Sequence, residues 1–456
     1  MNEPLLRRAH ERAVEFLRTL PERHVGARAT REELLAALDA PLTRDGDREE
    51  AVLELLADQG DRGTTASAGP RYFGFVIGGS LPVALAADWL VSTWDQNPGI
   101  YATSPITSVI EEIAARWLVE LFGLPRETSV GFVTGCQMAN FTCLAAARHG
   151  VLRRAGWNVE EEGLAGAPRV NLVASAESHI TIDVAMRYLG FGTRAIQRVE
   201  TDEQGRMRPD ALRRLLEHLN GPTIICAQAG NVNTGAFDPL REIAAIAREH
   251  NAWLHVDGAF GLWARTSESL APHADGIELA DSWATDAHKW LNVPYDCGIA
   301  LVRHAQDHRA SMTSTAAYLV QTSGVERDAV DWVPEFSRRG RGIPVYAALR
   351  HLGTRGVADL IDRCSARAQQ MADILRAEPR VQILNDVVLN QVLVRFDNDD
   401  ERTREVIARV QRDGTCWLGG TTWHGLAAMR ISVSHWATSE EDARVSAEAI
   451  LKAARA

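Results

Sequence analysis

One lysine in this sequence stands where chemistry, rather than solvation, would place it. Lys289 lies between His288 and Trp290, directly after an apparent strand, where access to water is poor. Lysine is almost never fully buried without a partner or a function. We expect burial to lower its pKa and so free its amine to condense with a carbonyl carbon. The structural alternative is a side chain that runs past Trp290 and brings its ammonium group to water.

A carboxylate upstream could serve the same site. The apolar run from Trp253 to Val256 predicts a strand, and Asp257 stands at its carboxyl end, followed by Gly258 and Ala259. Ligands of open α/β sheets bind at the carboxyl ends of the strands. There an aspartate can hold the nitrogen of a heterocyclic ring protonated, which makes the ring an electron acceptor. An ordinary aspartate-glycine turn is the alternative.

Two more segments carry groups suited to ligand binding. His179 comes shortly after a strand predicted at residues 170–175, and its ring could stack on a flat ligand or cap the next helix. The small-residue turn of Gly135, Cys136 and Gln137 precedes a helical run, and backbone N–H groups at a helix start attract phosphate. Each signal is weak or moderate alone, but their order and spacing together indicate one active site.

On these residues the chain resembles the group II pyridoxal-phosphate decarboxylases, which include aromatic-amino-acid, tyrosine and glutamate decarboxylases. The matches are His179, the HVDxA segment with Asp257 and Ala259, and the HKW segment with Lys289. Similar segments elsewhere are Pro70 to Phe75, Ser104-Pro105, Gly123-Leu124-Pro125, Asn233 to Pro239, Arg338-Arg339 and Arg430-Ile431-Ser432. The resemblance spans roughly residues 65–440.

The resemblance implies a fold type I enzyme, similar to aspartate aminotransferase, with pyridoxal 5'-phosphate as its cofactor. Lys289 would carry the cofactor, Asp257 would hold its ring nitrogen protonated, and His179 would stack on its ring. The other residues expected to contact the cofactor, several of them at its phosphate, are Ala259, Gly135, Cys136, Gln137, His288, Ser282 and Asn233.

The resemblance also implies a substrate and an assembly. The substrate would be an L-amino acid with an apolar or aromatic side chain, decarboxylated to the amine and carbon dioxide. Phe75 and Tyr101 would line its pocket, and Arg430 would bind its carboxylate, although an ion pair within the fold explains this arginine equally well. The enzyme would be a homodimer with its active site at the subunit interface.

Two departures from the family leave the outcome of the reaction open. The family has Asn-Pro before His-Lys, whereas this chain has Asp286-Ala287, which puts a carboxylate where an amide facing the phosphate is expected. Aligned without a gap, residues 328–339 place Ala329 where many members carry a tyrosine that protonates the substrate carbon after carbon dioxide leaves. The alternatives are oxidation to an aldehyde or cleavage of another carbon–carbon bond. A protein that binds the cofactor without turnover is a further hypothesis.

Composition fits a globular enzyme and argues against other classes of protein. The 456 residues are 46% hydrophobic, and the net charge of -11 does not suit a nucleic-acid surface. The six cysteines form no CxxC pair, which indicates reduced thiols in a cytoplasmic enzyme without a structural zinc site. Residues 1–10 are charged and lack the apolar core of a signal peptide. No run is long and apolar enough to span a bilayer.

The hydrophobic pattern predicts three regions. Residues 1–65 form short helices, one of them with a capping box from Thr30 to Glu33, and the resemblance implies that they embrace a partner subunit. Residues 66–345 form a large cofactor-binding α/β domain, and residues 346–456 form a smaller α+β domain. Strands of the large domain are expected at 170–175, 194–199, 223–227, 253–257 and 299–302, with helices such as 210–219 and 239–250 between them. This alternation predicts a largely parallel sheet covered on both faces.

Other segments carry more local predictions. A helix from Pro105 to Leu121 should end before Gly123, with an apolar face of Ile106, Ile110, Ile113 and Trp117 in the core. Residues 310–335 break the periodicity and predict a mobile lid over the cofactor. The smaller domain should contain a helix at 357–376, strands at 381–384, 390–396 and around 429–433, and a terminal helix with a Thr438–Glu441 capping box.

Overall fold

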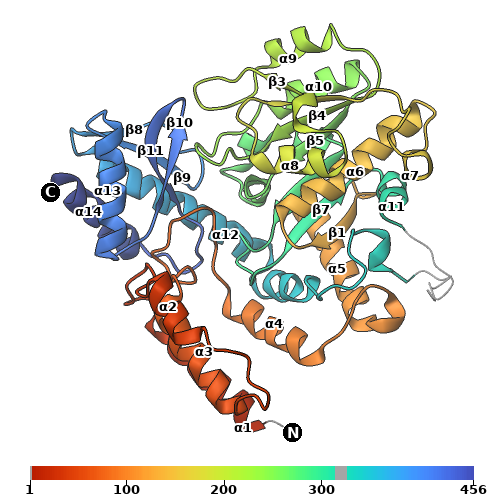
Figure 1. Ribbon diagram of the computed structural model, residues 1–456. Coiled ribbons are helices and arrows are strands. Elements are labelled where there is room, and N and C mark those ends of the chain that lie inside the picture. Colours follow the sequence, from red (N-terminus) through yellow and green to blue (C-terminus); the bar gives the residue numbers. More distant parts are fainter. Residues whose placement is uncertain (1–2, 314–325) are drawn as a thin grey trace. The chain divides into compact units, whose positions relative to one another are not determined.

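The computed structural model describes residues 3–313 and 326–456, and by their internal contacts these form two compact units (Figure 1). The large unit comprises Ser80–Ala366 and Asn385–Gln391. The small unit comprises Met1–Gly79, Arg367–Leu384 and Val392–Ala456. Residues 314–325 of the predicted lid lie outside the described residues, which leaves that prediction open.

A seven-stranded sheet forms the centre of the large unit. Its strands are β1 (Ser129–Val133), β2 (Asn171–Ser175), β3 (Ile196–Val199), β4 (Thr223–Gln228), β5 (Trp253–Asp257), β6 (Ser282–Asp286) and β7 (Gly298–Val302). Their order across the sheet is β1-β7-β6-β5-β4-β2-β3. The strands from β6 to β3 pair in parallel, whereas β7 is antiparallel to both of its neighbours. The prediction of a largely parallel sheet is confirmed.

Both faces of this sheet are covered. Every residue of β2, β4, β5, β6 and β7 is buried, although side chains in a strand point alternately to the two faces. At the end of β5, Asp257 is in register with Gln228 of β4 and Ala284 of β6. Strand β1 runs in the direction of β6, because each is antiparallel to β7 between them. The carboxyl ends of all these strands except β7 therefore lie along one edge.

Helices connect and cover the strands of the large unit (Figure 1). They are α4 (Pro82–Trp94), α5 (Pro105–Phe122), α6 (Cys136–Arg154), α7 (Val159–Glu162), α8 (Ile180–Tyr188), α9 (Pro209–Leu216), α10 (Leu240–Glu249) and α11 (Ala305–Met312). Short 3-10 helices are η1 (Tyr101–Thr103), η2 (Thr193–Ala195), η3 (Gly261–Thr266), η4 (Ala271–Ala274), η5 (Ile277–Leu279) and η6 (Ala329–Asp331). Helix α6 follows β1 after only two residues, so its first turn lies at the carboxyl edge of the sheet.

Helix α5 agrees with the prediction in its bounds but not in its buried face. Gly123 terminates it in a left-handed conformation, with φ of 62°. The positions that are buried are Thr107, Ser108, Glu111, Ala114, Leu118, Val119 and Phe122. Ile106 is 50% exposed, and Ile110, Ile113 and Trp117 are only partly buried. The prediction that these four residues form core is wrong, because a buried ion pair turns the polar side of the helix inward.

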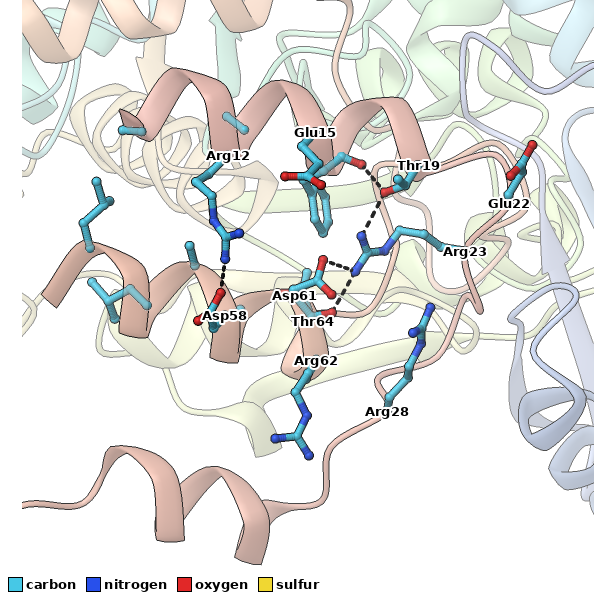
Figure 2. Close-up of a pocket in the computed structure, with 17 residues that line it drawn as sticks. Arg12, Glu15, Thr19, Glu22, Arg23, Arg28, Asp58, Asp61, Arg62 and Thr64 are labelled. Atoms are coloured by element: carbon cyan, nitrogen blue, oxygen red, sulfur yellow. Dashed lines mark hydrogen bonds and ion pairs between the residues drawn. The ribbon is translucent and has the colours of Figure 1, made fainter. Parts of the chain in front are cut away.

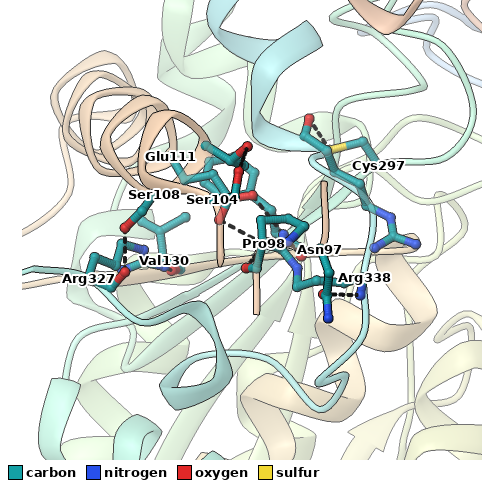
Figure 3. A network of polar contacts seen from close by, with 12 residues as sticks. Asn97, Pro98, Ser104, Ser108, Glu111, Val130, Cys297, Arg327 and Arg338 are labelled. Atoms are coloured by element: carbon teal, nitrogen blue, oxygen red, sulfur yellow. Dashed lines mark hydrogen bonds and ion pairs between the residues drawn. The ribbon is translucent and has the colours of Figure 1, made fainter. Parts of the chain in front are cut away.

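That ion pair joins Glu111 of α5 to Arg338 (Figure 3). Arg338 donates to the two carboxylate oxygens of Glu111 at 3.0 and 2.7 Å, and also to two backbone carbonyls. Nearby, Arg341 pairs with Asp296 at 2.8 Å. These contacts fix residues 338–341 beside the loop that connects Lys289 to β7. Arg338 and Arg341 thus both bind carboxylates of the protein itself.

The small unit combines helices with a four-stranded sheet of order β10-β11-β9-β8. Its strands are β8 (Val381–Ile383), β9 (Gln391–Phe396), β10 (Gly419–Trp423) and β11 (Leu426–Ser432). Its helices are α1 (Glu3–Thr19), α2 (Arg31–Leu38), α3 (Glu49–Gly63), α13 (Asp400–Asp413) and α14 (Glu440–Arg455). Helix α12 (Gly342–Arg376) contributes to both units and is interrupted at Gly353, where φ is 61°. The helix predicted at 357–376 is its second part.

Helix caps test the predictions at both ends of the chain. The capping box of Thr30 and Glu33 is present at α2. At α14 the cap is Ser439 with Asp442, one residue later than predicted. The hydroxyl of Thr438 instead donates to the carbonyl of Pro70 at 2.7 Å. Within the described ranges, no helix is long and apolar enough to cross a bilayer.

Candidate active site

A cavity of about 270 Å³ lies at the carboxyl edge of the large sheet. Its walls come from the ends of strands and from the loops and helix starts that follow them. The lining residues are Gly135, Cys136, Gln137, His179, Thr181, Gln228, Gly230, Val232, Asp257, Ala259, Phe260, Asp286, His288 and Lys289. Of the residues predicted to contact the cofactor, only Ser282 and Asn233 are missing from this set.

A larger cavity, of about 1050 Å³, lies between α1 and α3 (Figure 2). Its charged groups already pair with one another: Arg12 bonds to Asp58, and Arg23 lies 2.6 Å from Asp61. No lysine, cysteine or histidine lines it. We therefore place the candidate active site in the smaller cavity.

Lys289 projects into the smaller cavity from the loop after β6. Its side chain is 21% exposed, and its Nζ lies 2.9 Å from Oδ2 of Asp286. Burial acts to lower the pKa of Lys289, but the neighbouring charge of Asp286 raises it, and the net pKa lies above its usual value. The expectation of a lowered pKa is therefore wrong for this arrangement, because burial was considered without its ion-pair partner.

The second lysine of this chain lies elsewhere. Of the 49 lysine and arginine residues, only Lys289 and Lys452 are lysine. Lys452 is on α14, where its side chain is 80% exposed and its Nζ lies 3.4 Å from Asp413. Lys289 is therefore the only lysine side chain that lines the candidate site.

Asp257 ends β5 and faces the cavity with 6% of its surface exposed. Oδ1 accepts hydrogen bonds from the thiol of Cys136 at 3.5 Å and from the backbone N–H of Ala259 at 3.2 Å. Oδ2 accepts from Nδ2 of Asn140 at 3.2 Å. These three donors fix the carboxylate at the end of β5, where it faces the cavity and can pair with a protonated ring nitrogen.

Behind Asp257 lies a chain of buried hydrogen bonds that sequence analysis missed. Because Asn140 donates to Asp257 through Nδ2, its Oδ1 must accept from Nε2 of His255, at 2.9 Å. Nδ1 of His255 then accepts from the hydroxyl of Ser282 at 3.0 Å, and this hydroxyl accepts from Nε1 of Trp253 at 2.9 Å. Burial lowers the pKa of His255 to about 4, so the ring is neutral. The chain fixes the orientation of Asn140 and, through it, of Asp257.

This network explains why Ser282 does not line the cavity. Ser282 opens β6, whereas Asp286 ends the strand at the cavity edge. Its hydroxyl is fully buried and is bonded to His255 and Trp253. The phosphate contact expected of Ser282 has no support in this geometry. The signal for the network was present in the sequence as polar residues inside apolar runs, but their partners are far apart in the chain.

His179 caps a helix, which is one of the two roles considered for it, and its ring also lines the cavity. It is the N-cap residue of α8 and accepts from the backbone N–H of Thr181 at 3.4 Å, while its ring lines the cavity. The hydroxyl of Thr181 lies 2.9 Å from Nδ1 of His179 and accepts from Asn140 at 3.2 Å. The cap therefore orients the imidazole ring and links it to the residue that holds Asp257.

The turn before α6 provides the expected anion site. Gly135 precedes the helix, and Cys136 and Gln137 form its first turn. A Cβ on Gly298 of β7 would lie 2.3 Å from the backbone carbon of Gly135, so a side chain at that position would displace the turn. Opposite the turn, Nδ1 of His288 accepts from the backbone N–H of Cys297 at 3.0 Å, which leaves Nε2 as the donor. Burial lowers the pKa of His288, in keeping with a neutral ring.

The remaining predicted residues do not line this cavity. Tyr101 begins η1, and its backbone N–H donates to Asp328 at 2.7 Å. Asn233 lies in the loop that contributes Gly230 and Val232 to the lining. The other two belong to the small unit. Phe75 is 61% exposed there and stacks on Trp417, and Arg430 lies in β11.

The residues present fit pyridoxal phosphate. The cavity offers an amine to its aldehyde, a carboxylate to its ring nitrogen, an imidazole beside its ring and a helix start to its phosphate. One group departs from this fit. The carboxylate of Asp286 faces the same helix start, and its Oδ1 lies 3.7 Å from the position of a Cβ on Gly135.

The sequence matches a known family and several of its relatives. The family described as "Pyridoxal-dependent decarboxylase conserved domain" matches residues 32–397. Tryptophan decarboxylase 1 of Oryza sativa subsp. japonica is 28% identical over 424 residues, which cover 86% of this chain and 81% of that protein. An acidic amino acid decarboxylase of Mus musculus is 30% identical over 363 residues, covering 77% of this chain and 64% of that protein.

Solved structures share the fold over the whole chain. "Oryza sativa TDC with PLP and tryptamine" superposes with a TM-score of 0.92 at 24% identity, covering 100% of this chain and 98% of that one. Rhodiola rosea 4-hydroxyphenylacetaldehyde synthase superposes with a TM-score of 0.88 at 23% identity, covering 100% and 99%. The expectations of a fold type I enzyme and of pyridoxal 5'-phosphate as cofactor are confirmed. This chain belongs to the pyridoxal-dependent decarboxylases, the group II family of carboxy-lyases.

Proposed function

We propose that this enzyme removes the α-carboxylate of an L-amino acid with an apolar or aromatic side chain and releases the amine and carbon dioxide. The observation that carries the proposal is the convergence of Lys289, Asp257 and His179 on one cavity. Bound pyridoxal phosphate supplies a ring that takes up the electron pair of the broken bond.

Different residues of the cavity would attach the cofactor, set the charge of its ring and orient it. Lys289 would supply the amine to which the cofactor attaches. Asp257, positioned by three donors, would keep a proton on the ring nitrogen. The imidazole of His179, oriented by Thr181, would lie beside the ring. Nε2 of His288 and the N–H groups that begin α6 would hold the phosphate.

The composition of the cavity supports an apolar or aromatic substrate. Ala259, Val232 and Phe260 give it an apolar wall. An acidic side chain would need a cationic partner of its own. Lys289 is the only lysine or arginine among the described residues that line the cavity, and the cofactor occupies it. This counts against the substrate class named for the acidic amino acid relative.

We further propose that the enzyme works as a homodimer in the cytoplasm. No residue of α1, α2 or α3 is buried, and Leu6 and Leu56 on these helices are 67% and 60% exposed. On the large unit, Ile106 and Leu90 are 50% and 49% exposed. Large apolar surfaces of this kind mark protein–protein contacts. The six cysteines, all in the described part of the chain, are buried and form no disulfide, which suits a reducing compartment.

Oxidation to an aldehyde is the second candidate, and Ala329 favours it. Ala329 is 5% exposed in η6. The backbone N–H of the following residue, Val330, donates to the carbonyl of Gly99 at 3.0 Å. The methyl group of Ala329 can donate no proton, and Ala329 does not line the cavity. For each amino acid, the oxidative reaction would consume one molecule of dioxygen and one of water. It would release one molecule each of the aldehyde, carbon dioxide, ammonia and hydrogen peroxide. Tyr318, which could also donate a proton, lies outside the described residues.

One assay separates these outcomes. The purified enzyme is incubated with each common amino acid while carbon dioxide, amine, aldehyde and oxygen are measured. We expect carbon dioxide from an apolar or aromatic amino acid, with an equal amount of amine. Aldehyde and peroxide in place of amine would establish the oxidative reaction. Carbon dioxide from acidic amino acids alone would refute the proposed substrate class. Sedimentation that shows a fully active monomer would refute the dimer.

A further inference from the structure

Asp286 is held by its backbone so that its side chain enters the active site. It ends β6, three residues before Lys289, and is 2% exposed. Its N–H donates to the carbonyl of Ala259 at 2.9 Å, and its own carbonyl accepts from Nε1 of Trp263 at 3.0 Å. With both backbone groups bonded, the strand end holds the backbone of Asp286 at the edge of the cavity, which its side chain lines.

The carboxylate of Asp286 has one close partner. Oδ2 lies 2.9 Å from Nζ of Lys289. Oδ1 lies 3.5 Å from Nε2 of His288 and has no hydrogen-bond partner among the described residues. A buried carboxylate is stable only with a cation or several donors. The ammonium group of Lys289 therefore provides most of the compensation that Asp286 receives.

Other groups around Lys289 leave this ion pair dominant. They are Cys136, Tyr295, His288 and Asp257. Burial raises the pKa of Cys136 well above its usual value and that of Tyr295 to about 12, so both are neutral. Burial lowers the pKa of His288, which is neutral as well. Asp257 is charged but already accepts three hydrogen bonds.

We propose that Asp286 is a positioning residue that holds Lys289 as an ammonium ion and thereby sets the pH at which this lysine takes up the cofactor. The inference rests on the proposed attachment at Lys289. For attachment, Nζ must first release one proton to solvent. Its electron pair then bonds to the aldehyde carbon, and the aldehyde oxygen leaves with the two remaining amine hydrogens as water. By stabilising the ammonium form, Asp286 opposes the first of these steps.

The test replaces Asp286 by asparagine, which has the same shape without the charge and is the residue usual in the family. In the full-length protein freed of cofactor, amines are acylated in competition at a series of pH values. Lys452 is the internal reference, because it lies on the exposed surface of α14. Removing an opposite charge within 4 Å lowers the pKa of a lysine by about one to three units. In Asp286→Asn, Lys289 should therefore react about tenfold faster or more at neutral pH.

Cofactor uptake gives a second readout. At pH values below the midpoint of Lys289 acylation in the wild type, pyridoxal phosphate should bind Asp286→Asn faster by the same factor. Asp286→Glu retains the charge, so acylation of Lys289 should stay slow in this variant. Asp296→Asn is the matched control, because it removes a nearby carboxylate that pairs with Arg341 at 2.8 Å instead. It should leave the Lys289 midpoint unchanged.

The outcomes separate this inference from the proposed function. Equal midpoints for Lys289 in the wild type and in Asp286→Asn would overturn the role of Asp286. Borohydride reduction of the loaded wild type locates the cofactor independently. Cofactor on Lys452 would instead overturn the attachment site itself. Cofactor on Lys289 with unchanged midpoints would leave the attachment site intact and remove only this inference.

Discussion

Replacing Asn140 by leucine should take one hydrogen-bond donor from Asp257 while keeping the number and branching of the side-chain heavy atoms. Asn140 donates to Oδ2 of Asp257 at 3.2 Å and accepts from Nε2 of His255 at 2.9 Å. Hydrogen bonds to a charged group contribute about 1.5–3 kcal/mol. At about 1.4 kcal/mol for each factor of ten, kcat/KM should fall by about ten- to a hundredfold.

The same substitution should lower the free energy of unfolding. It leaves Nε2 of His255 buried without an acceptor, which costs about 1–3 kcal/mol in addition to the lost bond. We therefore expect a total loss of about 3–5 kcal/mol, allowing for some relaxation of the neighbouring side chains. Urea denaturation measures this loss, and steady-state kinetics at saturating cofactor measure kcat/KM.

Thr142→Val provides the matched control. Thr142 is also buried in α6, but its hydroxyl donates only within the helix, to the carbonyl of Met138 at 2.8 Å. This variant should lose some stability and keep the wild-type kcat/KM. If Asn140→Leu keeps the same kcat/KM as Thr142→Val, the proposed link between Asn140 and Asp257 is wrong.

Three further predictions test the site and the fold. Lys289→Ala should lose the visible absorption of the lysine-bound cofactor, and a cofactor-bearing Lys452 peptide after borohydride reduction would contradict this. Asp257→Asn should bind cofactor but turn over at least about a hundredfold more slowly, since an amide cannot hold the ring nitrogen protonated; near wild-type turnover would rule out the role. Burial lowers the pKa values of His255 and His308 to about 4 and about 3, below their ordinary value of 6.5. As pH falls below about 6.5, these histidines take up protons in the unfolded chain but not in the folded chain. Each of them should therefore lower the free energy of unfolding by about 1.4 kcal/mol per pH unit. Equal urea midpoints at pH 7 and pH 5 would contradict this prediction.

Part of the site could be predicted from short sequence motifs. Lys289, Asp257 and His179 each follow a strand within a few residues, so the strand pattern was enough to bring them to one edge. The contacts of Asn140 and Ser282 could not be predicted from the sequence. Asn140 bonds to Asp257, 117 residues away, and Ser282 bonds to His255, 27 residues away, and the type of a polar residue does not identify its partner. Tertiary contacts alone determine such pairs.

The apolar face of α5 shows another limit of sequence. Periodicity located Ile106 and its neighbours on one face but could not show whether their own subunit covers that face. Burial of Glu111 with Arg338 decided the orientation of the helix. An ion pair between residues 227 positions apart is not visible in the periodicity of either segment.

The scarcity of lysine has a consequence for a protein that handles aldehydes. Guanidinium groups remain protonated at neutral pH, so arginine presents no free amine to a carbonyl compound. With all but two of its 49 basic residues being arginine, the chain offers few side chains on which an aldehyde could form an adduct. Excess cofactor, or an aldehyde product released from the active site, would meet one exposed lysine, Lys452. The surface can thus carry many positive charges and still resist damage by reactive carbonyl compounds.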